Sequence, residues 1–368
     1  MKVIDKVEDR SLPAFLEALR SSLWGLPIQH SFYEDLTRKE WISIFKMSFH
    51  QTVEGHVADA IRSLPERLLP PQDLLFKWIV RLQRIDDKNQ KMAEVISYQG
   101  WLFQESGVKA YLQKGHGVSQ YYQKPEIRVG GDIDWYFPSR EDYSKANQLM
   151  KGQGERFQVQ AGYSSGYYFD GIETEHHLKL IQLRNPFILS YVKDLVKDLS
   201  KRNIWKDFGD TPVEIPAPIL NIIQVNAHIL KHQVTYGIGL RQLCDAAILY
   251  NEFHKQIDGN ELMEIYKKLG MLNWSHVFHR VLVDLLELDE KVLPYVIEEK
   301  KGVEWMKEYI LRTGNFGFYD PLNPDINKPG GRVNRTERLF SNFKQLFPLA
   351  PIETVCFPFV HLFSKVHH

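Results

Sequence analysis

Two aspartates, Asp132 and Asp134, stand two residues apart in the run DIDWYF, which alternates acidic with apolar or aromatic residues. This alternation has the period of a β-strand, in which residues i and i+2 project from the same face. The two carboxylates then lie roughly 6–7 Å apart and repel each other unless a cation lies between or above them. Mg²⁺ fits this role, because it prefers oxygen ligands and keeps positions open for phosphate. The alternative is a solvent-facing edge strand that simply carries two charges.

The residues before this pair have the chemistry to bind phosphate. The run KGHG contains Lys114 and Gly115 at an expected junction between a strand and a helix, where glycine lets backbone N–H groups approach an anion. Arg128 and Gly131 belong to the glycine-rich loop that leads into the aspartates. A guanidinium group is suited to holding phosphate oxygens. These residues therefore predict a phosphate-bearing ligand next to the carboxylates.

A third carboxylate is expected on a later strand. Glu173 and Glu175 lie in the alternating run IETEHHLKL and share one face of it. Beside a metal-bound pair, a third carboxylate can complete the coordination and accept the proton of an attacking hydroxyl group. We predict this role for Glu175, because histidines follow it, and Glu173 is the alternative. Phosphoryl or nucleotidyl transfer requires such a set.

The elements that must position these residues form a compact α/β unit over residues 107–185. Alternating runs separated by turn residues predict about five strands and two helices there, with Ser139 as the N-cap of the second helix. Residues 1–106 and 186–368 repeat apolar residues at spacings of three and four, which indicates helices, one of them beginning near Gln72. The sequence thus predicts an α+β fold, in which helical N- and C-terminal regions flank a small mixed sheet.

The run YLQKGHGVSQYYQKPEIRVGGDIDWYF resembles the uncharacterised nucleotidyltransferase family of the polymerase-β-like nucleotidyltransferase superfamily. Members of that family also carry an acid with a nearby histidine on a later strand, as Glu175 and His177 do here. The wider superfamily places Gly-Gly or Gly-Ser before the carboxylates, whereas His116 follows Gly115 in this chain. The residues that carry the resemblance are Lys114, Gly115, Tyr121, Tyr122, Pro125, Arg128, Asp132, Ile133 and Asp134.

The resemblance implies a Mg²⁺-dependent enzyme that moves a nucleoside monophosphate from a nucleoside triphosphate to a hydroxyl acceptor. The acceptor is a small molecule, a protein or an RNA end, and the cleft is expected between the sheet and the helices beyond residue 216. One or two Mg²⁺ ions would be held by Asp132, Asp134 and Glu175. The nucleotide would be bound by Lys114, Gly115, Arg128, Gly131 and Arg241. For Arg241 the alternative is an i,i+4 ion pair with Asp245 on the helical run LRQLCD.

Other patterns suggest different functions. Residues 162–166 match the nucleophile-elbow pattern GxSxG, but their alternating flanks favour a β-hairpin. A catalytically inactive nucleotide-binding or protein-interaction module of the same fold is a further alternative. The basic residues Lys328, Arg332, Arg335 and Arg338 could contact RNA or another anionic partner, or could form a solvated helix face. A His-rich zinc hydrolase would use Glu175, His176, His177, His228 and His232.

The composition excludes several classes of protein. The 368-residue chain carries 46 basic and 46 acidic residues, so its formal net charge is zero and no strong general affinity for nucleic acid is expected. Its two cysteines, Cys244 and Cys356, exclude a disulfide framework, and both are expected to be buried in helices. The sequence shows neither a secretory signal nor the ~20 apolar residues of a membrane helix. A cytoplasmic protein without membrane contact is therefore expected.

Overall fold

The computed structural model describes residues 10–160, 164–320 and 335–366. It begins with an N-terminal bundle of three α-helices. The second of them starts with a capping box, in which the Thr37 hydroxyl accepts from the Glu40 N–H and the Glu40 carboxylate accepts from the Thr37 N–H. The three helices are α1 (Ser11–Trp24), α2 (Arg38–His50) and α3 (Glu54–Ile61).

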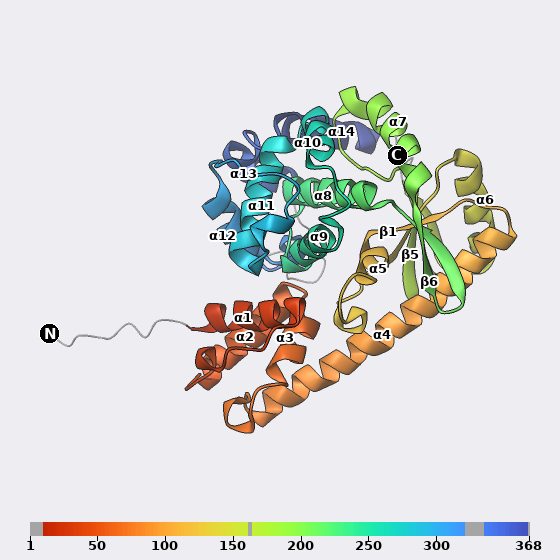
Figure 1. Cartoon of the computed structure of the whole chain (residues 1–368). Helices are drawn as coiled ribbons and strands as arrows, with labels where there is room; N and C mark the ends of the chain where they lie inside the picture. The colour runs from red at the N-terminus through yellow and green to blue at the C-terminus, as the bar shows by residue number, and fades with distance from the viewer. Residues whose placement is uncertain (1–9, 161–163, 321–334, 367–368) are drawn as a thin grey trace.

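The long helix α4 (Gln72–Glu105) connects this bundle to the β-sheet, as Figure 1 shows. It begins where the sequence predicts, directly after two prolines, which cannot continue a preceding helix. Near its start, Trp78 packs edge-on against Trp41. Near its end, Phe103 packs edge-on against Trp135 of the sheet. One helix of 34 residues therefore contributes to packing at both ends of the molecule.

The central sheet has five strands in the order β1-β2-β5-β4-β3. Only β2 and β5 run parallel, and the other neighbours are antiparallel. Two helices accompany the sheet, α5 (Lys114–Ser119) and α6 (Arg140–Lys151), and the Ser139 hydroxyl caps α6 by accepting from the Asp142 N–H. The predicted α+β class is thereby confirmed. The strands are β1 (Tyr111–Gln113), β2 (Ile133–Tyr136), β3 (Glu155–Gln160), β4 (Ser164–Phe169) and β5 (Ile172–His177).

A separate hairpin, formed by β6 (Ile204–Phe208) and β7 (Thr211–Ile215), lies against α4. The Gln104 amide donates to the Pro212 carbonyl at 2.7 Å. The sequence predicted only helices beyond residue 186, so this hairpin was not among the expected elements. Its run IWKDFGDTPVEI does alternate, and Gly209 takes the positive φ of +59° that the turn needs.

The remaining chain is helical, and no described helix is long and apolar enough to cross a membrane. Cys244 is buried in α9 as expected, whereas Cys356 in α14 is only half-buried, so the expectation for Cys356 is wrong in that respect. The helices are α7 (Leu189–Leu199), α8 (Pro218–Thr235), α9 (Leu240–Phe253), α10 (Gly259–Leu269), α11 (Leu272–Leu286), α12 (Val303–Thr313), α13 (Arg335–Leu346) and α14 (Pro351–Val366).

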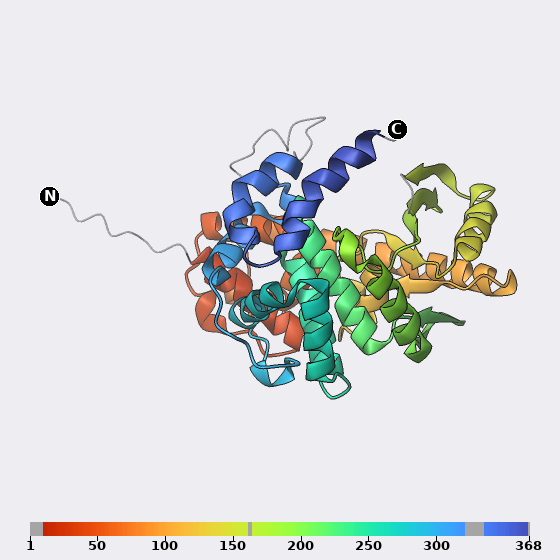
Figure 2. The ribbon, with the colours of Figure 1, turned by 90° about the horizontal axis from the view of Figure 1, so that it is seen from above.

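Apolar side chains gather in two cores. The first is shared by the N-terminal bundle and the C-terminal helices and includes Phe15, Trp78 and Leu282. The second lies between α4, the sheet and the hairpin and includes Trp135 and Val213. Figures 1 and 2 show the sheet and α6 at one end of the molecule and α10–α13 at the other. Helix α4 supplies residues to both cores and so ties the two ends together.

Candidate active site

The pairing of two parallel strands brings the predicted carboxylates together. In the register of β2 and β5, Asp134 lies directly opposite Glu175. Paired residues project from the same face of a sheet, so the two side chains are neighbours there. Asp132 lies at the entrance to β2, two residues earlier, and its side chain is largely but not fully buried. Glu173 is exposed on β5 and is displaced from Asp134 by two residues along the strand.

Asp134 forms the buried floor of this carboxylate group, with only 3% of its surface exposed. Its Oδ1 atom accepts from Lys114 Nζ at 2.7 Å and from His177 Nε2 at 2.7 Å. His177 Nε2 also lies 3.2 Å from Oε2 of Glu175. Ligand atoms of Asp134, Glu175 and His177 all lie within 4.8 Å of one another. A small cation can therefore be held by the carboxylates of Asp134 and Glu175 from two neighbouring strands, and by His177 only if its Nε2 atom carries no proton.

The electrostatics of the carboxylates also favours a bound cation. Burial, together with the negative charge of Asp134, raises the pKa of Asp132 to about 6. Burial alone would raise the pKa of Asp134 as well, but the Lys114 ammonium and the His177 hydrogen bond lower it. The Lys114 ammonium thus keeps the Asp134 carboxylate ionised, whereas the ionised form of Asp132 is disfavoured. A divalent ion with oxygen ligands would relieve this repulsion.

A strained turn between β1 and α5 aims Lys114 at Asp134. Gln113 is the partner of Asp134 in the β1–β2 ladder, and Lys114 follows it directly. Lys114 has φ +35° and Gly115 has φ +38°, and both values lie in the left-handed region that residues other than glycine rarely adopt. Such strain costs on the order of 1–3 kcal/mol and persists where the surroundings require the conformation. Here the strained backbone of Lys114 accompanies the contact between its ammonium group and the Asp134 carboxylate.

Arg128 lies outside the open part of this site. It is 4% exposed and makes two hydrogen bonds of 2.7 Å to the carboxylate of Asp245, which also accepts from the Tyr122 hydroxyl at 2.7 Å. The ion pair of Asp245 is therefore with Arg128 rather than with Arg241, the partner that the helical spacing suggested. Arg241 instead donates to the Val129 carbonyl at 3.2 Å. A Cβ on Gly131 would lie 3.6 Å from the Arg241 guanidinium, so these two predicted residues are close together.

Helix α8 covers the carboxylate face of the sheet. Gln113 shares this face with Asp134, and the Gln224 amide of α8 donates to the Gln113 side chain. About two turns further along α8, the ammonium of Lys231 donates to Oε1 of Gln182. A helix from the region beyond residue 216 thus lies against the sheet, where the sequence predicted one wall of the cleft.

Gln182 links Lys231 to the carboxylate group. Lys231 has only donors, so Gln182 must present its oxygen to it, and the amide nitrogen then faces His177 Nδ1 at 3.2 Å. His177 Nδ1 accepts that bond, and the proton of the neutral ring therefore lies on Nε2, facing Asp134 and Glu175. Gln182 and Lys231 were not among the site residues predicted from the sequence. Gln224, His228 and Lys231 do recur at helical spacing on α8, but this spacing alone does not show which element the polar stripe faces.

The alternative of a histidine-rich zinc site is not supported, because the five residues named for it do not come together among the described residues. His176 points to the opposite face of the sheet, where Nε2 lies 2.9 Å from the Tyr167 hydroxyl and Nδ1 lies 2.8 Å from Asn147. His228 and His232 contact each other on α8, with ring centroids 4.2 Å apart, and neither joins the group that could hold a metal.

The remaining sequence patterns also take structural roles. In the GxSxG match, Gly162 and Tyr163 lie outside the described residues, but the flanking β3 and β4 pair antiparallel, as predicted for a hairpin. Of the basic stretch, Lys328 and Arg332 lie outside the described residues. Arg338 is buried and donates to the carbonyls of Tyr236 and Gly317. The alternative that it belongs to a solvated helix face is therefore wrong for this residue.

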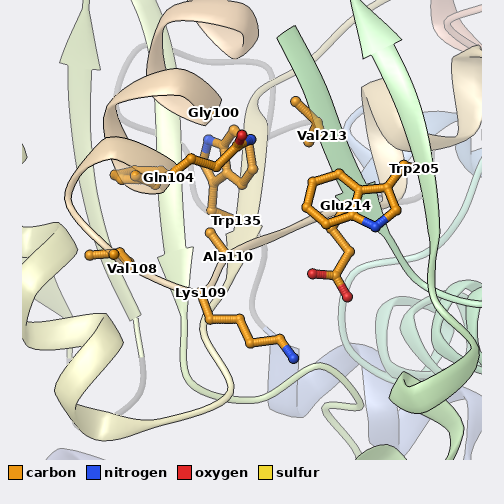
Figure 3. A pocket seen from close by; sticks show the side chains of 11 residues that line it. Gly100, Gln104, Val108, Lys109, Ala110, Trp135, Trp205, Val213 and Glu214 are labelled. Atoms are coloured by element: carbon orange, nitrogen blue, oxygen red, sulfur yellow. The ribbon is translucent and has the colours of Figure 1, made fainter.

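A cavity of about 400 Å³ lies on the side of the sheet away from the carboxylates. Trp135, which alternates with Asp134 on β2, contributes to its lining, as do Gly100 of α4 and Val213 and Trp205 of the hairpin. Figure 3 shows the hairpin side chains facing α4 across this space. Because successive strand residues project to opposite faces, the cavity is separate from the carboxylate group.

In the comparison with protein-family models, residues 37–286 match a family described as uncharacterised nucleotidyltransferase. The match covers more than half of the chain, from the start of α2 to the end of α11. It includes the strands, the carboxylate group and α8. The comparisons with curated proteins and with solved structures gave no match.

Proposed function

Because this chain belongs to the uncharacterised nucleotidyltransferase family, we propose that it transfers a nucleoside monophosphate from a nucleoside triphosphate to a hydroxyl group, with Mg²⁺ at the carboxylates. The observation that carries the proposal is the register of β2 and β5, which sets Asp134 beside Glu175 with Asp132 two residues away. The acceptor is a small molecule, a protein side chain or an RNA end. In this proposal the residues that hold the metal are Asp132, Asp134 and Glu175.

Each group of the site has a part in this reaction. When bound, Mg²⁺ neutralises the charge of the triphosphate and of the leaving pyrophosphate. Glu175, whose side chain is only partly buried, accepts the proton of the acceptor hydroxyl group as the hydroxyl oxygen bonds to the α-phosphorus and the bond to pyrophosphate breaks. The His177 proton on Nε2 keeps Asp134 and Glu175 aligned. Lys114 and Arg241 face the same region and favour an anionic ligand.

A nucleotide-binding module without turnover is a second candidate, and one contact favours it. The Lys114 ammonium lies 2.7 Å from Asp134 and thus already supplies a positive charge among the carboxylates. In such a module Lys114 would take the place of the metal. Nucleotide binding would then be independent of Mg²⁺, and no pyrophosphate would be released in the presence of any acceptor.

The test is a calorimetric titration of nucleoside triphosphates with a non-hydrolysable α,β-bond, with and without Mg²⁺. The wild type is compared with Asp134→Asn and with Asp194→Asn, a matched change on exposed α7. We expect one nucleotide to bind the wild type and the control only with Mg²⁺, and Asp134→Asn to weaken this binding at least tenfold. Equal binding by Asp134→Asn and the wild type would overturn the assignment of the carboxylates.

A further inference from the structure

The side chain of Lys231 is half-buried over the carboxylate group without a partner of opposite charge. Its ammonium donates to the neutral amide oxygen of Gln182, and among the described residues no carboxylate forms an ion pair with it. A charged group that is removed from water is normally paired, because its desolvation is costly. An ammonium that is instead held by an amide is available to an anion that the site binds.

The charges around Lys231 show where such an anion would lie. Burial, and then the positive charges of Lys114 and Arg184, lower the pKa of Lys231 to about 7, while Glu175 and Asp134 oppose this shift. The ammonium groups of Lys231 and Lys114 therefore share one region and repel each other. With the carboxylates occupied by a divalent cation, the excess positive charge there requires an anion. The other titratable groups coupled to Lys231 are His228 and His232 on α8 and Glu353 on α14.

We propose that Lys231 binds a phosphate oxygen of the triphosphate and that Gln182 positions it for this contact. The inference rests on the proposed function, because it concerns the same site. It makes Lys231, which comes from the helical part of the chain, a substrate-binding residue opposite the carboxylates of the sheet. Gln182 is a positioning residue, since it touches both Lys231 and His177 but carries no charge.

The test uses two probes, Mg²⁺-ATP and Mg²⁺-tripolyphosphate, titrated into the full-length protein. The change Lys231→Met removes the charge with little loss of side-chain length, and Lys193→Met makes the same change at an exposed position on α7. We expect Lys231→Met to weaken the binding of both probes at least tenfold and Lys193→Met to leave it unchanged. Wild-type affinity of Lys231→Met for tripolyphosphate would overturn the proposal.

A second variant separates binding by charge from a purely structural role. Lys231→Arg stays protonated at all accessible pH values, whereas Lys231 loses its proton near pH 7. Between pH 6.5 and 8.5 the wild type should therefore lose affinity for tripolyphosphate relative to Lys231→Arg. Protonation of tripolyphosphate itself affects both proteins equally and so does not change the ratio of the two affinities. A pH-independent ratio would count against the phosphate contact.

The two proposals fail in different ways. If the wild type binds tripolyphosphate through Lys231 but binds no nucleotide, the transferase proposal fails and the phosphate contact stands. If nucleotide binding needs Mg²⁺ and Asp134 but is unaffected by Lys231→Met, the transferase proposal stands and the phosphate contact fails. A wild type that binds no tripolyphosphate also overturns the contact.

Discussion

Arg128 shows how burial decides what a charged side chain does. Its guanidinium makes two hydrogen bonds to the Asp245 carboxylate, and Tyr122 donates to the same group. The sequence pattern presents Arg128 as a phosphate ligand, because it stands four residues before Asp132 in a glycine-rich loop. The structure gives it a partner from α9 instead. The pair therefore joins the loop before β2 to the helical part of the chain.

Breaking this pair should be costly, whereas replacing both partners should not. Asp245→Asn leaves the Arg128 charge buried without compensation, so we expect the free energy of unfolding to fall by about 3 kcal/mol. Urea denaturation followed by circular dichroism measures this loss. The double change Arg128→Met with Asp245→Leu should lose less than the sum of the single changes, because no charge remains buried. Strictly additive losses would show that the two residues act independently.

At the scale of elements, α14 holds the loop that carries Gln182. Glu353 of α14 is 5% exposed and accepts the backbone N–H groups of Arg184 and Asn185 at 2.6–3.2 Å. The Arg184 guanidinium also lies 5.3 Å from the centre of the Phe357 ring. Helix α14 lies beyond the residues that the family model matches, yet it contacts a loop next to the carboxylate group. The C-terminal helix thus supports the site from outside the family's matched region.

The docking of α14 should make stability depend on pH. Burial raises the pKa of Glu353 from 4.5 to about 7 in the folded protein. The folded state then binds this proton more tightly than the unfolded state does. The stabilisation that the protonated Glu353 gives the folded state is therefore complete below pH 4.5, and it is lost as the pH rises through 7. Over this pH range the free energy of unfolding of the wild type should fall by up to about 3 kcal/mol relative to that of Glu353→Gln, whose side chain stays neutral. Urea denaturation of both proteins from pH 4 to 8 measures the difference, and equal slopes would contradict the prediction.

How much of the fold could be predicted depended on whether the signal was local. The alternation around Asp134 and Glu175 predicted both strands, and Ser139 predicted the start of α6. The parallel pairing of β2 with β5 joins segments far apart in the chain, and no local pattern specifies it. Lys231 was missed for the same reason, since its role depends on which face of α8 meets the sheet. The hairpin after Leu199 was missed because a helical region was expected to continue through it.

At the scale of the whole molecule, the candidate site lies where the two cores meet. Asp134 and Glu175 project from the sheet, whose opposite face packs in the core with Trp135. Lys231 comes from α8, which packs in the core shared by the N- and C-terminal helices. The relative placement of these groups therefore depends on the elements that bridge the cores. Helix α4 is the longest of these, and it runs unbroken from one core to the other.

A break in α4 should therefore affect the site, because α4 joins the two cores and because Lys88, next to the break, donates to the carbonyls of Gly130 and Gly131 just before Asp132. Asp87 is exposed between the two halves of the helix, and Asp87→Pro removes a backbone hydrogen bond and forces a clash with the preceding turn, at a cost of about 3 kcal/mol or more. Because the cores would then be less firmly joined, tryptophan fluorescence and far-UV circular dichroism should no longer show coincident unfolding transitions. Mg²⁺-ATP should also bind more weakly, while Asp87→Ala preserves both properties. If Asp87→Pro unfolds in one transition and binds Mg²⁺-ATP as Asp87→Ala does, then contacts other than α4 hold the carboxylates opposite Lys231.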